Sequence, residues 1–268
     1  RVKTPARLMA MNPLKINITG VRGIVGETLT PHLIVQFTQA FGAYAGGGRI
    51  YICNDARRSA AMVRSAVISG LLATGCEPVD FGVCPTPSMQ YAAANSDAAG
   101  AIAISAGHNS EDWNALRFIR FDGMYLNAQQ GDELLDVYNA GEFPKAQWDG
   151  IKKLEKCEKP FGEHIAAIIK AFDAKAIKKR KFTVAVDTCN GACSEAVASL
   201  LDALGCKAIL LHNQPGRGFP HNPEPSADSM QPLAAIVKAL GADAGFMFDS
   251  AGERLGIVSD DGTPLPEE

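Results

Sequence analysis

Short apolar runs alternate along this chain with longer segments in which apolar residues recur every three or four positions. An apolar, β-branched run of about five residues favours a buried strand, whereas the three-to-four spacing favours a helix. The pattern predicts strands over residues 49–53, 78–81, 101–104, 117–121, 182–186, 207–211 and 244–248. It predicts helices over residues 31–44, 57–74, 161–175, 192–203 and 228–240, with a further short helix from residue 87. Strands that alternate with helices of about ten residues or more indicate a mostly parallel sheet covered on both faces.

The alternation is interrupted between residues 140 and 160, where the periodicity is lost and prolines and lysines gather. We place a domain boundary there, with one domain over residues 12–155 and a second over residues 156–268. A chain of 268 residues is long enough for two domains. Because both halves repeat the same order of strands and helices, we expect two similar three-layer α/β/α domains with mixed, mainly parallel sheets.

The charge balance argues against several classes of partner. Lys and Arg number 26 and Asp and Glu number 29, so the formal net charge is −3, whereas a nucleic-acid or anionic-membrane binder would carry a basic excess. The basic run over residues 175–181 is typical of a solvated helix end. No run approaches the roughly 18 apolar residues of a membrane span, and residues 1–12 lack the apolar core of a signal peptide. We therefore expect a cytoplasmic protein with no nucleic-acid or membrane partner.

Cysteines and histidines outside the candidate loops receive structural interpretations. The seven cysteines lie at irregular spacings within apolar segments, which predicts buried free thiols in a reducing compartment. Cys189 and Cys193 are four residues apart, but no second pair or adjacent histidine in the sequence completes a zinc site. We expect His212 to be a surface or packing residue and His221 to order its loop.

In open α/β sheets, ligands bind at the carboxyl ends of the strands. This rule directs attention to the loops over residues 18–26, 53–59, 104–114 and 249–254. The third loop is the most informative, because the small residues of SAGHNS (105–110) would let a ligand approach the backbone closely. His108 would serve as an acid or base, and Ser105 and Ser110 as nucleophiles or phosphate ligands. A plain strand-end turn with a Ser or Asn cap is the structural alternative.

Two other loops carry charged groups at strand ends. Asp249 and Glu253 follow the predicted strand over residues 244–248, with Arg254 behind them, and carboxylates in such loops are ligands that Mg²⁺ takes beside a phosphate. Arg22 lies in a glycine-rich loop that lacks the spacing of a nucleotide-binding motif, and an arginine there would suit phosphate capture. A plain turn is the alternative in both places. In the loop over residues 53–59, Asp55 and Arg57 form an acid–base pair that we expect to hold a turn.

Seven segments, in the same order, resemble motifs of the α-D-phosphohexomutase family, whose members include phosphoglucomutase, phosphomannomutase and phosphoglucosamine mutase. The segments are ITGVRGIVGETLTP (18–31), NDARRSA (54–60), VCPTPSMQYA (83–92), AIAISAGHNS (101–110), VDTCNGACS (186–194), GRGFPHNPEP (216–225) and FDSAGERLGIVSDDG (248–262). The resemblance implies reversible transfer of a phosphoryl group between the 1 and 6 positions of a hexose phosphate of the glucose or mannose class, through a phosphoserine and a Mg²⁺ ion. It covers the first two of the family's four domains, so we expect a fragment or a natural half whose C-terminal domains are missing.

The resemblance and the loop chemistry together assign roles to individual residues. The candidate catalytic residues are Arg22, Ser105, His108, Ser110 and Arg117. The candidate phosphate-binding residues are Arg22, Gly107, Asn109 and Arg254. The candidate Mg²⁺ ligands are Asp249 and Glu253.

Departures from the family motifs fall on the chemistry. When the motifs are aligned on His108, the phosphoserine position is Gly107, the middle metal carboxylate is Ala251, and a lysine of the family is Arg117. Three interpretations stay open: a mutase with Ser105 or Ser110 as a displaced nucleophile, a catalytically silent phosphosugar-binding homologue, and an ordinary mutase in which positions 107 and 251 are not native. The displaced nucleophile is disfavoured because a nucleophile must lie within about 3–3.5 Å of the reacting atom and in line with it. Of the three, we take mutase membership as the functional prediction.

Overall fold

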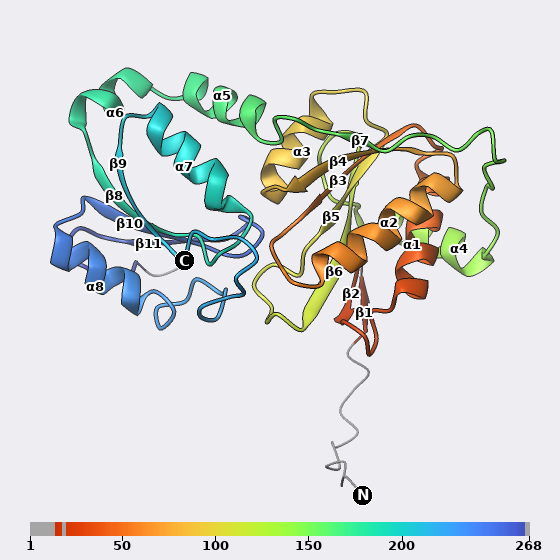
Figure 1. The fold of residues 1–268 in the computed structure, drawn as a ribbon, viewed down its shortest axis with the longest axis horizontal. Coiled ribbons are helices and arrows are strands. Elements are labelled where there is room, and N and C mark those ends of the chain that lie inside the picture. Colours follow the sequence, from red (N-terminus) through yellow and green to blue (C-terminus); the bar gives the residue numbers. More distant parts are fainter. Residues whose placement is uncertain (1–13, 18–19, 266–268) are drawn as a thin grey trace, which may run out of the picture.

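The computed structural model describes residues 14–17 and 20–265, which form two α/β units that follow one another along the chain (Figure 1). Three parts of the chain lie outside the described residues. They are residues 1–13, which include the segment tested above for a signal peptide, then Ile18 and Thr19 of the glycine-rich motif, and residues 266–268. Within the described part, no helix is both long enough and apolar enough to span a bilayer.

The first unit is built on a seven-stranded sheet. Its strands, in spatial order, are β1 (Lys15–Asn17), β2 (Gly20–Ile24), β6 (Trp113–Arg120), β5 (Gly100–Ile104), β3 (Arg49–Asn54), β4 (Glu77–Val83) and β7 (Glu155–Lys156). Strands β5, β3, β4 and β7 pair in parallel, whereas β1, β2, β6 and β5 pair antiparallel. This sheet is mixed, as predicted, but it is not mainly parallel. The reason is the connection after β5, which is too short for a crossover helix and returns the chain antiparallel in β6.

Helices cover both faces of the first sheet. The helices of this unit are α1 (Pro31–Tyr44), α2 (Ala60–Ala73), α3 (Thr86–Ala94) and α4 (Ala128–Ala140). Ile50 and Ile52 of β3 pack in a core beneath α1 and α2, to which α4 also contributes side chains. Tyr51 and Cys53 pack in a second core, on the opposite face, beneath α3. Since successive side chains of a strand point to opposite faces, β3 is buried on both sides. This explains why the sequence shows it as a continuous apolar run.

The second unit has a four-stranded sheet that is mainly parallel, as predicted. Its order is β11 (Leu255–Val258), β10 (Ala244–Phe248), β8 (Thr183–Asp187) and β9 (Lys207–Leu211), with only the β10–β11 pairing antiparallel among these strands. One core lies beneath α8 (Gln231–Leu240) and the other beneath α7 (Cys193–Ala203). The three-layer α/β/α architecture is therefore confirmed in both units.

The segment between the two cores differs from the prediction in two places. The predicted helix over residues 161–175 is two helices, α5 (Gly162–Ala171) and α6 (Ala174–Arg180), because Phe172 is extended and the Asp173 side chain caps α6 by accepting from the Ala176 N–H at 3.0 Å. The basic residues over 175–181 are at the exposed end of α6, as expected. Residues 141–154 contain neither helix nor strand.

The first unit extends slightly past the predicted boundary at residue 155. Lys156 pairs with Asp80 in β7, and the Cys157 N–H donates to the Asp80 carbonyl at 2.8 Å. The chain then enters α5, which contacts α3 of the first unit and α7 of the second. All seven cysteines are free thiols, and the five at positions 53, 76, 84, 189 and 193 are buried.

Candidate active site

A buried hydrogen-bond network joins the loops that follow β3, β5 and β10. Its centre is Arg57, whose side chain is fully buried and forms an ion pair with Asp55. Arg57 Nη1 also donates to Ser250 Oγ at 2.8 Å, and Nη2 donates to the carbonyl oxygens of Gly107 at 2.9 Å and Asn109 at 2.5 Å. The pair that we expected to hold a local turn therefore connects both units at the carboxyl ends of their strands.

Ser105 lies inside this network. It is buried, its Oγ donates to Asp55 Oδ2 at 2.6 Å, and the same oxygen accepts from the Gly107 N–H at 3.0 Å. The structure thus gives this hydroxyl a structural role, and attack on a phosphorus atom would require it to leave its carboxylate partner. Ser110 is exposed and donates to Asp112 Oδ1 at 2.6 Å. Its predicted catalytic role stays a prediction.

Gly107 faces the acidic loop of the second unit. Its φ is +57°, and a Cβ atom on this residue would lie 3.3 Å from Asp249 Oδ2, 3.7 Å from Arg117 Nη2 and 3.8 Å from Glu253 Oε2. Any side chain at position 107 would therefore point at the predicted metal ligands. The loop motifs assigned to phosphoryl transfer and to the metal come together even though residue 107 offers no functional group.

Asp249 has a free oxygen at this junction. Its Oδ1 accepts from the backbone N–H groups of Glu253 at 2.8 Å and Arg254 at 3.2 Å, whereas its Oδ2 is buried and has no hydrogen-bond partner among the described residues. Burial raises the pKa of this carboxyl, although the two backbone donors oppose the shift. An unpartnered buried carboxylate oxygen is costly. A cation would satisfy it, and Mg²⁺ is commonly held by one or two carboxylates with water and substrate phosphate.

Glu253, the second predicted metal ligand, is occupied by the first unit. Its Oε2 forms an ion pair with Arg117, and its Oε1 accepts from the Tyr125 hydroxyl. Burial alone would lower the pKa of Arg117, but the charge of Glu253 and of Tyr125 and their hydrogen bonds raise it. Burial and the neighbouring Glu253 raise the pKa of Tyr125. To bind a cation together with Asp249, Glu253 would have to release one of these partners.

Cationic groups line the rest of the junction. Arg22 Nη1 donates to Asn109 Oδ1 at 2.8 Å, and burial followed by the charge of Arg117 lowers the pKa of Arg22. His108 Nε2 lies 3.6 Å from Glu224 Oε2. Burial lowers the pKa of His108; the charge of Glu224 opposes this shift, and the nearby arginines Arg254, Arg22 and Arg117 reinforce it. At neutral pH His108 is therefore a neutral imidazole within a cationic site.

The sequence of both units matches one protein family. The model of phosphoglucomutase/phosphomannomutase α/β/α domain I matches residues 14–145, and that of α/β/α domain II matches residues 160–262. The chain belongs to the phosphoglucomutase/phosphomannomutase family. The predicted resemblance is thereby confirmed.

Relatives within the family are named as mutases. A phosphoglucomutase/phosphomannomutase of Thermococcus kodakarensis is 37% identical over 249 residues, which cover 91% of this chain and 54% of the relative. A probable phosphoglucosamine mutase of the same organism is 35% identical and covers 91% and 53%, respectively. The crystal structure of a putative phosphomannomutase from Thermus thermophilus shares the fold, with a TM-score of 0.84 at 20% identity over 94% of this chain and 58% of that one. The chain thus spans about half the length of the curated relatives it matches.

Two residues at the junction of this family member were missed by the sequence analysis. Tyr125, which donates to Glu253, follows a tight turn and carries no local signal. Glu224 lies within the quoted segment GRGFPHNPEP and forms an ion pair with Arg254, but its position in that segment does not indicate a partner. Both approach the junction only through the packing of the two units.

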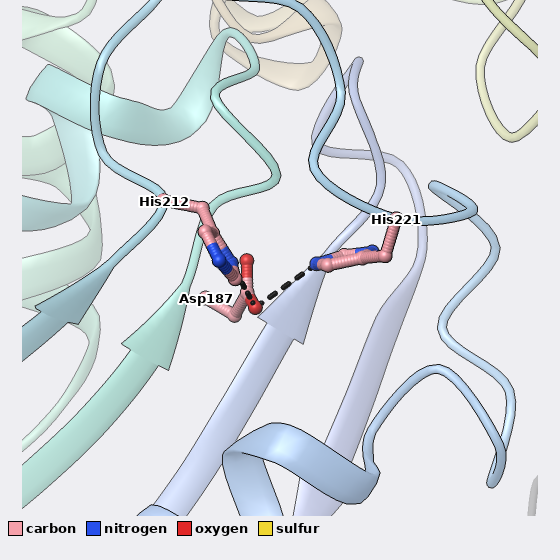
Figure 2. Close-up of side chains that lie close together, drawn as sticks. All are labelled: Asp187, His212 and His221. Carbon is pink, nitrogen blue, oxygen red and sulfur yellow. Dashed lines mark hydrogen bonds and ion pairs between the residues drawn. The ribbon is translucent and has the colours of Figure 1, made fainter.

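A further cluster lies outside the junction, at the ends of β8 and β9 (Figure 2). The Asp187 carboxylate lies 2.8 Å from His212 Nδ1 and 3.0 Å from His221 Nε2. Burial would raise the pKa of Asp187, but its hydrogen bonds to His221, to the Cys189 N–H and to His212 lower it. His212 is therefore more than the surface or packing residue that we expected.

Proposed function

We propose that the protein acts on hexose phosphates as a phosphohexomutase-type enzyme, with the phosphate group held where the other three candidate loops meet Arg22, which lies in strand β2 and not in the predicted loop. The observation that carries the proposal is the junction itself: Arg22, Arg117 and Arg254 all lie near enough to His108 to lower its pKa, and position 107 faces both Arg117 and the buried Oδ2 of Asp249. Such an arrangement provides fixed positive charge for phosphoryl oxygens. Family membership and the mutase names of the relatives support the reaction class, and we infer a substrate of the glucose or mannose class.

Each group at the junction has a defined task in this proposal. Arg22 and Arg254 bind phosphate oxygens, and neutral His108 can accept a proton from a sugar hydroxyl or return one to it. Mg²⁺ bound by Asp249 and Glu253 would supply additional charge neutralisation. Arg117 keeps its proton beside Glu253, so it orients that carboxylate and contributes charge, and it does not act as a proton donor.

The experiment uses the full-length parent protein, because this chain spans about half the length of the relatives it matches. A coupled assay would combine glucose 1-phosphate, catalytic glucose 1,6-bisphosphate and Mg²⁺, and we expect turnover above the buffer control. Arg22→Gln should lower kcat/KM by about 100-fold, since losing one preorganised charge commonly costs this much. Equal rates for the protein and the buffer control would reject enzymatic turnover.

A second function, phosphosugar binding without transfer, is favoured by one observation. Residue 107 has no side chain, and the hydroxyl of Ser105 is committed to Asp55. Titration calorimetry with glucose 1-phosphate, followed by intact-mass measurement after incubation with glucose 1,6-bisphosphate, distinguishes the two functions. Binding that Arg22→Gln weakens, without any phosphorylated chain or turnover, would establish the silent homologue. A phosphoryl group that chases from the protein onto the sugar would exclude it.

A further inference from the structure

Three potential metal ligands from distant parts of the sequence face one another in the second unit (Figure 2). Asp187 ends β8, His212 follows β9, and His221 lies in the loop before α8. One ligand atom from each residue lies within 4.8 Å of the other two. Asp187 is almost fully buried, while the side chains of His212 and His221 are 35% and 15% exposed. The cluster is thus anchored in the core and open to solvent on one side.

Local hydrogen bonds fix the carboxylate and the first histidine. Asp187 Oδ1 accepts from the Cys189 N–H at 2.9 Å, which leaves Oδ2 to face both rings. Strands β8 and β9 are parallel neighbours in which Asp187 pairs with Leu211, so His212 emerges beside the end of β8. His212 has a φ of +46°, rare for a residue other than glycine. The Thr188 hydroxyl holds that conformation by donating to the His212 carbonyl at 2.9 Å.

The second histidine has the hydrogen-bond arrangement of a metal ligand. His221 Nδ1 lies 2.8 Å from the carbonyl oxygen of Asn222. A carbonyl only accepts, so Nδ1 carries the hydrogen, and in the neutral ring Nε2 carries the lone pair. In the metal-free protein a proton on Nε2 forms the hydrogen bond to the Asp187 carboxylate, and a metal ion that displaces this proton would bind the same two atoms. Metal-bound histidines characteristically donate their other N–H to a backbone carbonyl or a carboxylate in this way.

We propose that Asp187, His212 and His221 bind one divalent transition-metal ion, with Zn²⁺ as the best match and a fourth position open to water. Two imidazole nitrogens and one carboxylate oxygen are ligands that suit Zn²⁺, whereas Mg²⁺ takes oxygen ligands. In a tetrahedral site with bonds of about 2.1 Å, ligand atoms lie roughly 3.4 Å apart. The present N···O distances of 2.8 and 3.0 Å would therefore open by about 0.5 Å as the metal replaces the shared protons.

Such an ion would secure the loop that reaches the first unit. Between His212 and His221 the chain carries Phe219, whose ring lies 4.9 Å from the guanidinium carbon of Arg57 in the first unit. Fixing both His212 and His221 to the end of β8 closes the base of this loop. The site shares no residue with the Asp249 loop, so the proposal stands independently of the proposed activity.

The test is a titration of the EDTA-treated, dialysed protein with Zn²⁺ alone. We expect one equivalent to bind and the thermal unfolding midpoint to rise. His221→Ala should weaken Zn²⁺ binding by at least about tenfold, whereas His32→Ala, an exposed histidine of α1, should leave it unchanged. Asp249→Asn should also retain the equivalent of Zn²⁺. Should His221→Ala fail to fold, His212→Ala at the more exposed position provides the same comparison.

Two results would overturn the proposal. One is equal Zn²⁺ affinity for the wild type and both ligand variants, or no Zn²⁺ bound to the wild type. The other is a thiolate-to-metal charge-transfer band when Co²⁺ replaces Zn²⁺, because it would assign the ion to the nearby cysteines. A weak ligand-field spectrum without that band, lost in His221→Ala and kept in His32→Ala, supports the site.

Discussion

Position 107 offers a direct way to test the chemistry one residue at a time. Its missing side chain would face Asp249 and Glu253, and the motif resemblance places Ala251 at the middle carboxylate position of the metal loop. We expect Gly107→Ser combined with Ala251→Asp to take up a phosphoryl group from glucose 1,6-bisphosphate in the presence of Mg²⁺, measured by intact mass. The serine variant should lose about 1–2 kcal/mol of unfolding free energy, because φ is +57° at this position.

Gly107→Ala is the matched control for that experiment, since it imposes the same backbone strain without a hydroxyl. Combined with Ala251→Asp, it should remain unphosphorylated. Equal phosphorylation of the alanine and serine versions would show that another residue accepts the group. No phosphorylation of either would show that the junction no longer supports transfer.

Two buried aspartates at the junction should respond oppositely to the same substitution. Asp249 Oδ2 has no hydrogen-bond partner, so Asp249→Asn should leave the unfolding free energy unchanged or raise it by about 1 kcal/mol in metal-free buffer. Asp55 pairs with buried Arg57, so Asp55→Asn should lower it by about 3–5 kcal/mol. Urea unfolding at pH 7 measures both. A large loss of unfolding free energy in Asp249→Asn would mean that the charge of the Asp249 carboxylate is already compensated in the wild type.

At the scale of elements, the contact between α5 and α3 predicts a pH dependence. His164 Nδ1 lies 3.0 Å from Ser88 Oγ, and the His164 ring stacks on Tyr91. Burial lowers the pKa of His164 below 6.5, so the folded protein binds this proton less readily than the unfolded chain. Its stabilisation is therefore complete above about pH 6.5 and is lost as the pH falls through the lowered folded value.

The measurement is an NMR titration of the His164 imidazole together with urea unfolding between pH 5 and 8. The stability advantage of the wild type over His164→Gln should shrink as the pH falls. His32→Gln, at an exposed position in the first turn of α1, is the comparison for a general histidine effect. If the stability advantage over both variants shrank equally as the pH fell, the pH dependence would not arise from the contact between α5 and α3.

The elements that the sequence predicted are those whose burial dictates their pattern. Strands β3, β5, β8 and β10 lie inside their sheets, so apolar side chains must occupy both faces. Helix α4 was missed because only Gly131 and Leu134 of it are buried, which leaves little periodicity to detect. Strands β1 and β7 have three and two exposed residues, and β2 is rich in glycine. Each of these strands depends on its neighbour in the sheet and has no strong pattern of its own.

At the scale of the whole molecule, Ser250 couples the two units. It is fully buried, accepts from Arg57 and donates to the Gly107 carbonyl at 2.7 Å. Ser250→Ala should cost about 1–3 kcal/mol, because it leaves buried partners unsatisfied. Because those partners lie in the other unit, the two units should then unfold less cooperatively.

Ser194 provides the matched control. It is also buried, but within the described residues its side chain bonds only to Thr188 and Gly191 of the same unit, so Ser194→Ala should not affect the coupling.

Fluorescence and circular dichroism provide the two readouts. Trp113 lies in β6 of the first sheet, whereas Trp148 is 86% exposed, so the change in fluorescence should report mainly on the first unit. Far-ultraviolet circular dichroism reports on both units. In Ser250→Ala we expect the fluorescence and dichroism midpoints in urea to separate, and in Ser194→Ala we expect them to coincide. Coincident midpoints in both variants would show that other contacts suffice for the coupling.

The sequence could place the candidate loops at the carboxyl edge of each sheet, because parallel strands bring their carboxyl ends to one edge. How that edge is occupied was not predictable. Glu224 reaches His108 from 116 positions further along the chain (224 − 108), and Asp187 meets His212 and His221 across 25 and 34 positions. Such pairings depend on how two folded units dock and how one loop closes. Neither is encoded in local periodicity.

The position of Glu224 has a consequence for how an anion would enter. Its carboxylate already lies against His108 and Arg254, so the protein carries a resident negative group at the place where a phosphate would arrive. Entry is then an exchange of one anion for another. At the proposed site, a doubly charged phosphate would compete for Arg254 better than a singly charged ester, and Glu224 would have to move away from Arg254 before the phosphate could bind.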